Sequence, residues 1–321
     1  MERELNLSII IPVYNGEKTI CECLDSVLKC PYKGYEIIVI DDGSVDGTDK
    51  ILERNYTDEI KLIKQKNAGV SAARNKGLLC AQKDYLVFLD SDDAFCDNWW
   101  EKLEEYKEND ITLYNYLRKK NDVIQEILTM RNAQETLDEI KMTYILTDDV
   151  NAVCAKIYKR KLLLDFKIQF PQDMKIGEDA VFFGRALQKA KKVKYCPNAF
   201  YVYIDNLNSA SYQKIVNFDD QRKLYEFKKG FIIENNMLIY EEKFYIKFLG
   251  DFISRLRQST GSYAHFRELI LSAENYEYIK WLINFKYETL PLRRKIQVVL
   301  LKIKAYRVLF FELECERLVN E

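Results

Sequence analysis

The chain has 321 residues, of which 48% are hydrophobic, and its 49 Lys and Arg nearly balance its 50 Asp and Glu. This length and composition predict one large or two ordinary folded domains, and the net charge of −1 argues against general binding of nucleic acid. With a single histidine and eight cysteines that include no CxxC pair, zinc sites, a disulfide framework and His-based catalysis are not expected. Any catalysis is therefore expected to depend on carboxylates.

No segment of the sequence is suited to crossing a membrane or directing export. The longest uncharged stretch, Leu5 to Gly16, is shorter than the roughly 18 residues of a spanning helix. The charged residues Glu2, Arg3 and Glu4 do not fit a signal peptide. We therefore expect a cytoplasmic protein whose cysteines are reduced packing residues.

Over the first 117 residues, short β-branched runs alternate with longer amphipathic runs, as in βαβ units around a mainly parallel sheet. Strands are predicted at Leu7 to Val13, Tyr35 to Asp41, Ile60 to Lys66, Tyr85 to Asp90 and Ile111 to Tyr116. Helices are predicted at Glu17 to Leu28 and from about Thr48 and Val70.

The pattern then becomes mixed. A helix is predicted at Ala133 to Leu146, and strands at Ala152 to Tyr158 and Val193 to Tyr203 enclose a helix at Asp179 to Lys189. From Lys214 onward the pattern is helical. The sequence thus predicts an α/β domain at residues 1–213, with a Rossmann-like mixed sheet and flanking helices, followed by a mainly α-helical C-terminal region at 214–321.

Polar residues follow four of the predicted strands, and the carboxyl ends of such strands meet at one edge of a sheet. These residues include Tyr14 and Asn15, then Asp41 and Asp42, then Asn67, Gly69 and Arg74, and finally Asp90, Ser91, Asp92 and Asp93. Five carboxylates with one nearby cation favour a hard metal ion such as Mg²⁺ or Mn²⁺, holding a diphosphate. The sequence has neither GxGxxG after the first strand nor GxxxxGK[ST], which disfavours a dinucleotide site and a P-loop.

Five segments in order make the chain similar to a known family. They are SIIIPVYNG (8–16), VIDDGSVDGT (39–48), KNAGVSAARNKG (66–77), FLDSDD (88–93) and GED (177–179). Together they resemble the family 2 glycosyltransferases, which have a GT-A fold, use nucleotide sugars and invert the anomeric centre. Taken singly, these segments differ in strength: a DxD is common by chance, and the acids of a GED at a helix start also fit the helix dipole.

The resemblance implies a role for each matching residue. The loop that holds the nucleotide would contain Pro12, Val13 and Tyr14, and uracil would be hydrogen-bonded by Asp42. The base and diphosphate would be surrounded by Asn67, Gly69 and Arg74. The nucleotide would also be contacted by Asp90 and Ser91. Asp92 and Asp90 would bind the metal, with Asp93 as a further candidate ligand. Asp179 would be the base that takes the acceptor proton, and Glu178 competes for that role.

The chemistry supports these roles independently. Transfer from a nucleoside diphosphate needs neutralised phosphate charge and a base, but no nucleophile of the enzyme. One position departs from the family pattern: Tyr203 is followed by Ile204 and Asp205, where relatives often have Arg or His. The metal or a lysine such as Lys214 would have to compensate.

The expected function is inverting transfer from a UDP-sugar to a hydroxyl of a saccharide or lipid-linked saccharide, in bacterial surface polysaccharide or glycoconjugate assembly. One alternative is a catalytically silent scaffold that binds nucleotide sugars. A second, with less support, is a sugar-phosphate nucleotidyltransferase, because the loop after the first strand is not Gly-rich and basic as such an enzyme would require. The donor sugar depends on the variable stretch Leu117 to Lys175 and on the helical tail, and it is not readable.

The C-terminal region contains a basic amphipathic segment. Residues 286–311 carry seven basic residues against one acid. Leu292, Ile296, Val299, Ile303, Tyr306 and Phe310 would form one helical stripe. The segment predicts contact with an anionic membrane surface, as a peripheral protein at the inner face of the cell membrane; packing within the tail or in a homo-oligomer is the alternative.

Overall fold

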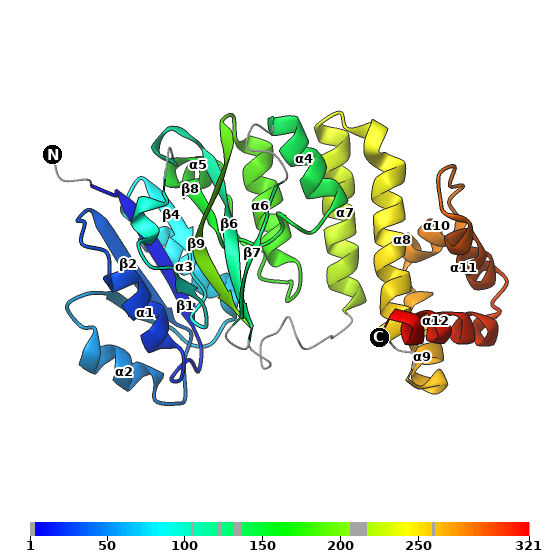
Figure 1. Cartoon of the computed structure of the whole chain (residues 1–321), viewed down its shortest axis with the longest axis horizontal. Helices are drawn as coiled ribbons and strands as arrows, with labels where there is room; N and C mark the ends of the chain where they lie inside the picture. The colour runs from blue at the N-terminus through cyan, green and yellow to red at the C-terminus, as the bar shows by residue number, and fades with distance from the viewer. Residues whose placement is uncertain are drawn as a thin grey trace. The chain divides into compact units, whose positions relative to one another are not determined.

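The structure is a computed structural model that describes residues 4–103, 106–120, 123–130, 136–205, 217–258 and 261–320. The chain divides into unit 1, which comprises residues 1–144 and 148–214, and unit 2, which comprises residues 145–147 and 215–321. Figure 1 shows the strands in unit 1 and the long helices α7 and α8 in unit 2. The predicted boundary between residues 213 and 214 lies outside the described residues.

Unit 1 is built on a mixed sheet, to which the described residues contribute nine strands. Their order is β3-β2-β1-β4-β8-β6-β9-β5, and β7 pairs with β6 outside this path. The strands are β1 (Leu7–Val13), β2 (Tyr35–Asp41), β3 (Lys61–Lys64), β4 (Tyr85–Phe88), β5 (Ala94–Phe95), β6 (Ile111–Lys120), β7 (Val123–Ile127), β8 (Lys156–Lys159) and β9 (Val193–Ile204). The first four are parallel, whereas β8 is antiparallel to both β4 and β6.

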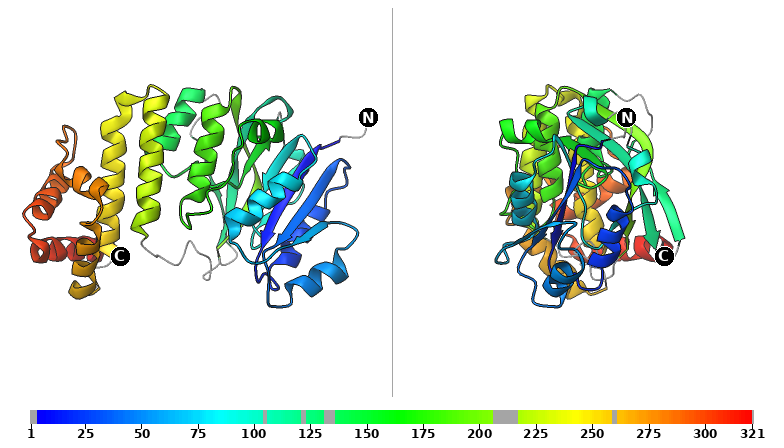
Figure 2. Two further views of the ribbon diagram at one scale, coloured as in Figure 1. Left: turned by 180° about the vertical axis from the view of Figure 1, so that it is seen from behind. Right: turned by 90° about the vertical axis from the view of Figure 1, so that its left-hand side faces the viewer.

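Helices cover both faces of this sheet (Figures 1 and 2). The helices before β9 are α1 (Ile20–Leu28), α2 (Thr48–Asn55), α3 (Val70–Cys80), α4 (Leu137–Leu146), α5 (Arg160–Asp165) and α6 (Glu178–Lys189), with 3₁₀ turns at Trp99–Glu101 and Tyr106–Glu108. Of these, α4 packs on α6 through Tyr144 and Phe183. The side chains of β1 alternate between the faces, so Ile9 and Ile11 join a core cluster with α1 while Ile10 meets α3. A Cβ atom at Gly77 of α3 would lie 2.3 Å from Ile10 Cγ2, and this closeness explains the glycine.

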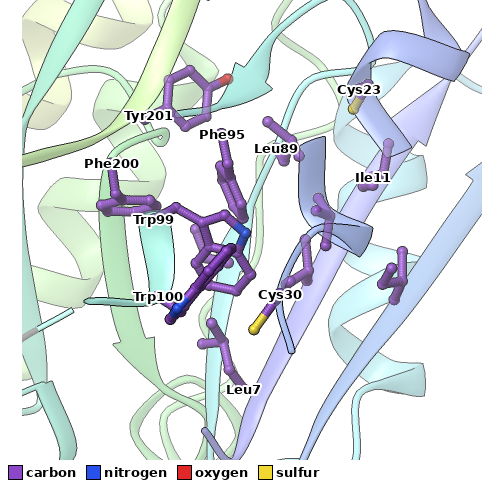
Figure 3. Packing of buried hydrophobic residues seen from close by; sticks show 14 of the residues in the cluster. Leu7, Ile11, Cys23, Cys30, Leu89, Phe95, Trp99, Trp100, Phe200 and Tyr201 are labelled. Carbon is purple, nitrogen blue, oxygen red and sulfur yellow. The ribbon is translucent and has the colours of Figure 1, made fainter. Parts of the chain in front are cut away.

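The core on the α1 face is rich in aromatic rings. Trp99 is fully buried and packs against Phe95, with ring centroids 4.8 Å apart. Figure 3 shows these rings beside Cys23 and Cys30, which pack in the same cluster. All eight cysteines lie in described residues and none forms a disulfide.

Unit 2 consists, in the part that the structure describes, of helices packed around α8. They are α7 (Phe218–Glu234), α8 (Glu241–Gln258), α9 (Tyr263–Ala273), α10 (Glu277–Asn284), α11 (Leu292–Lys302) and α12 (Tyr306–Asn320), with a 3₁₀ turn at Leu238–Tyr240. Phe244, Leu249 and Ile253 on α8 are buried in this core. Within the described ranges, no helix is long and apolar enough to cross a membrane.

Three predictions about elements need correction. The strand predicted at Ala152 to Tyr158 begins only at Lys156, because Ala155 has a φ of +54° and bends the chain. The strand predicted at Ile111 to Tyr116 continues to Lys120 and forms a hairpin with β7. The single stripe predicted across 286–311 is divided between α11 and α12, since Lys304 has a φ of +56° and ends the first helix.

Candidate functional site

The ends of β1 and β4 and the first turns of α3 and α6 line a cavity of about 510 Å³ in unit 1. Its lining consists of Pro12, Val13, Tyr14, Asp42, Val70, Ala73, Arg74, Asp90, Ser91, Asp92, Asp93, Glu178, Asp179 and Tyr203. All the residues to which the resemblance assigns a role are among them except Asn67 and Gly69. The β1–β2 register explains part of this convergence, because Val13 lies beside Asp41 and the two following loops start together.

Asp42 anchors the loop that leads into α3. Its buried carboxylate accepts hydrogen bonds from Gln65 Nε2 at 2.8 Å, Ala68 N at 2.9 Å and Gly69 N at 2.8 Å. Gly69 has a φ of +90°, which favours glycine there. Asn67 and Gly69 do not line the cavity, but they belong to the loop that Asp42 holds in place. Asn67 is exposed.

The guanidinium of Arg74 joins two of the predicted acids. Nη2 lies 2.7 Å from Asp90 Oδ1, and Nη1 lies 2.7 Å from Asp179 Oδ1. The arginine is buried, and its guanidinium carbon lies 5.3 Å from the centroid of the Phe170 ring. Arg74 thus connects the DxD segment to the start of α6, where its partner Asp179 lies 105 positions further along the chain.

Asn75, which follows Arg74, explains why α6 lies beside α3. Its side-chain amide pairs with both backbone groups of Phe170: Nδ2 donates to the carbonyl at 2.9 Å, and Oδ1 accepts from the N–H at 2.8 Å. The Phe170 ring stacks on Phe182 of α6 with centroids 3.9 Å apart. This asparagine was part of a recognised motif, but its positioning role was not predicted from the sequence.

The two acids that begin α6 have raised pKa values. Burial raises the pKa of Asp179, while the charge of Arg74 opposes the shift. Burial and the neighbouring charge of Asp179 raise the pKa of Glu178 to about 7. Asp179 Oδ2 also accepts a hydrogen bond from Val153 N at 3.2 Å, so both of its oxygens are oriented. Glu178 Oε1 lies 3.6 Å from Arg74 Nη1.

Asp93 has a structural role. Its Oδ2 accepts from the Tyr201 hydroxyl at 2.5 Å and its Oδ1 accepts from Ile204 N at 2.9 Å, which ties the turn after β4 to β9. Burial and the charge of Asp90 raise the pKa of Asp93 to about 8. Because both of its oxygens are engaged, Asp93 is a weak metal-ligand candidate. Asp92 lines this cavity and also an adjoining one of about 780 Å³.

The charges of the cavity fit a divalent cation. Six carboxyl groups line it against the single guanidinium of Arg74. In the part of the chain that the structure describes, no three His, Cys, Asp or Glu side chains form a complete ligand set. Mg²⁺ is commonly held by one or two carboxylates together with substrate phosphates and water. Asp92 and Asp90 therefore suit a metal that binds with a diphosphate.

A cation lies near the position after Tyr203 where the sequence lacks one. Arg118 of β6 is opposite Tyr203, and its guanidinium binds both carboxylate oxygens of Asp205 at 2.8 and 3.1 Å. No motif indicates this contact, because it depends on the β6–β9 register. Lys214, the other suggested cation, lies outside the described residues.

Comparison with known proteins agrees with this geometry. Residues 8–165 match the family described as Glycosyl transferase family 2. The putative glycosyltransferase EpsH of Bacillus subtilis is 32% identical over 244 residues, which cover 72% of this chain and 70% of EpsH. The poly(ribitol-phosphate) beta-glucosyltransferase of Bacillus spizizenii is 33% identical over 62% of this chain, but the match spans only 32% of that longer protein.

The mixed sheet is curled and flanked by helices, and the chain belongs to glycosyl transferase family 2. The crystal structure of residues 1–349 of Staphylococcus aureus TarS in complex with UDP-GlcNAc has a TM-score of 0.66 and is 21% identical to this chain. The match covers 98% of this chain and 92% of that one, and it shows the GT-A fold with a helical C-terminal region.

Proposed function

We propose that this protein transfers a sugar from a UDP-sugar to an acceptor hydroxyl with inversion, in a reaction that requires Mn²⁺ or Mg²⁺. The observation that carries the proposal is the Arg74 guanidinium, which contacts Asp90 of the DxD segment and Asp179 in one cavity. Family membership and the UDP-GlcNAc bound by TarS support the donor class.

The residues divide the chemistry between them. Asp92 and Asp90 would hold the metal, which when bound neutralises charge on the departing diphosphate. Asp179 takes the proton of the acceptor hydroxyl as its oxygen forms the new bond to the anomeric carbon. The bond from that carbon to the phosphate oxygen breaks on the opposite face and UDP leaves with the electron pair. No covalent bond to the enzyme forms.

The decisive experiment measures UDP release from a panel of UDP-sugars, with Mn²⁺ or with EDTA. We expect metal-dependent release from at least one sugar. Asp92→Ala should abolish it and weaken UDP binding in Mn²⁺, while the weaker metal-free binding is nearly unchanged. Asp97→Ala is the matched control, because Asp97 is exposed and pairs with Lys29 outside the cavity.

Other outcomes would reject the proposal. Equal loss of UDP binding with and without metal would mean that Asp92 is structural. Binding of UDP-sugars without release or transfer would favour the scaffold, and formation of a UDP-sugar from UTP and a sugar phosphate would favour the nucleotidyltransferase.

We further propose that the acceptor belongs to a bacterial surface polymer and is a saccharide or lipid-linked saccharide. The relative named for poly(ribitol-phosphate) glucosylation supports this setting. A lipid-linked acceptor would lie in the membrane, so an enzyme held at the cytoplasmic face of the membrane would be close to it.

The surface of α11 supports such a location. Leu292, Ile296, Val299 and Ile303 are 75%, 49%, 52% and 66% exposed and follow helical spacing, whereas Val298 and Leu301 pack inward. Lys295 and Lys302 are exposed beside this stripe. An exposed apolar stripe flanked by lysines complements an anionic lipid surface. We therefore propose that this face of α11, the α11 stripe, lies on anionic membranes.

A further inference from the structure

Lys156, the first residue of β8, is a buried cation with no assigned role. It is 2% exposed, and its Nζ lies 4.9 Å from the centroid of the Phe183 ring. Among the described residues the only hydrogen bond of its ammonium group is to the carbonyl oxygen of Ala152, and no carboxylate forms an ion pair with that group. Burial lowers the pKa of Lys156 to about 8, and the nearby Cys154 and Asp179 oppose this shift. A buried ammonium whose hydrogen-bond partner is a single backbone carbonyl costs free energy. Its presence here therefore points to a role for this contact.

The carbonyl that Lys156 holds belongs to the peptide group that contacts the proposed base. The carbonyl of Ala152 and the N–H of Val153 are opposite ends of one planar peptide group. The Val153 N–H donates to Asp179 Oδ2 at 3.2 Å. A positive charge on the carbonyl end polarises the group and strengthens the donor at its other end. Lys156 and Asp179 are therefore linked through a single peptide group.

The backbone between these contacts is bent. Ala155 is buried and has a φ of +54°, a conformation that residues with a Cβ atom adopt at a cost. This bend folds the chain so that Lys156 reaches back to Ala152. The carbonyl oxygen of Ala155 accepts a hydrogen bond from Tyr114 N at 3.0 Å, which ties the bend to β6.

We propose that Lys156 is a positioning residue for Asp179, which fixes and polarises the Ala152–Val153 peptide so that Val153 orients Oδ2 while Arg74 orients Oδ1. The inference rests on the proposed function, because it takes Asp179 as the base. Loss of Lys156 would leave the carboxylate oriented from one side only and would remove a nearby positive charge. Both changes disfavour the ionised form of Asp179.

The test compares Lys156→Met with Lys156→Arg, which keeps the charge. We expect Lys156→Met to lower kcat by about tenfold with little change in the KM for the UDP-sugar, since misplaced catalytic groups affect turnover. The acid limb of its pH–rate profile should move to higher pH, and Lys156→Arg should keep the limb near its original position. The groups that face Asp179 and also influence this limb are Arg74, Asp90, Glu178, Cys154 and Tyr158.

Two controls separate positioning from general structure. Lys159→Met changes an exposed lysine of the same strand and should leave kcat unchanged. In an Asp179→Asn background, Lys156→Met should cause no further loss, because its effect passes through Asp179. If Lys156→Met does not fold, Lys156→Gln, which keeps an N–H donor without the charge, is measured by the same criteria.

The inference is overturned if the uncharged variant keeps the wild-type kcat and acid limb, or if it slows Asp179→Asn as much as it slows the wild type. An inactive Asp179→Asn beside a normal Lys156→Met rejects only the role of Lys156. An Asp179→Asn variant with normal turnover instead rejects the base assignment on which the inference rests.

Discussion

Arg74 offsets the charge of acids that belong to two different steps of the proposed reaction. Its two terminal nitrogens contact Asp90, beside the proposed metal ligand, and Asp179, the proposed base, both at 2.7 Å. Because the guanidinium is buried against Phe170, it has little freedom to leave these acids independently. Spacing in the sequence indicated that these residues share an edge, but not that one side chain connects them.

The two acids that begin α6 can be distinguished by substitution. Asp179→Asn is nearly isosteric but cannot accept the proton, so we expect turnover to fall by about 100-fold or more with little change in donor affinity. Glu178→Gln should have a milder effect. Steady-state kinetics with the identified UDP-sugar measure both, and a normal Asp179→Asn beside an inactive Glu178→Gln would reverse the assignment.

Glu178 also makes a prediction about stability. Its pKa is about 7 in the folded chain against a usual value of 4.5, so between these pH values the folded state holds a proton that the unfolded state has lost. Raising the pH through this window therefore lowers the free energy of unfolding. Glu178→Gln removes this loss and should gain on the order of 2 kcal/mol, or about 4–8 °C, relative to the wild type between about pH 5 and pH 8. Thermal unfolding of both proteins checks this; a constant difference across the range would contradict it.

At the scale of elements, the parallel part of the sheet was predicted more closely than the antiparallel part, of which β5 and β7 were not predicted. The β-branched runs of β1 and β2 are fully or mainly buried, and their local pattern alone predicts where each strand begins and ends. The β8 strand was predicted too long because the bend at Ala155 has no glycine to mark it. The Arg118–Asp205 and Lys156–Ala152 contacts were missed for a related reason: they depend on strand register and a loop bend rather than on a motif.

The close approach of α3 to β1 leads to a stability prediction. Gly77→Ala would place Cβ 2.3 Å from Ile10 Cγ2, so the overlap should outweigh the better helix propensity of Ala and destabilise unit 1 by about 1–3 kcal/mol. Gly250→Ala on α8 is the matched control, since nothing lies within 4 Å of the added atom and up to about 1 kcal/mol of stabilisation is expected. Urea unfolding measures both, and equal effects at the two sites would show that α3 shifts freely.

At the scale of the whole molecule, the charge distribution matters more than the net charge of −1. The chain is nearly neutral, yet the segment around α11 is basic and carries an exposed apolar stripe. Not every basic residue there is available to lipid. Arg293 pairs with Glu312 at 2.7 Å, and Arg294 donates to Gln297 at 2.6 Å. The sequence pattern could not separate these from the exposed lysines, nor show that Tyr306 and Phe310 are buried.

The structure thus selects which residues should bind an anionic membrane. Each lysine near the surface contributes about 1 kcal/mol, so changing both Lys295 and Lys302 to Gln should weaken binding of the full chain to anionic vesicles by roughly 30-fold. The double variant Ile296→Ser with Ile303→Ser should also weaken vesicle binding, because it removes apolar contact. The control is Lys161→Gln with Lys192→Gln, an equal charge change at exposed sites of unit 1, which should leave vesicle binding unchanged.

Co-sedimentation with phosphatidylglycerol vesicles and with neutral phosphatidylcholine vesicles, at low and high salt, measures these effects. Binding to anionic vesicles that high salt weakens is the expected result. Failure to bind at either salt concentration rejects the membrane face, and self-association lost in Ile296→Ser with Ile303→Ser would instead assign the α11 stripe to a second copy of the chain.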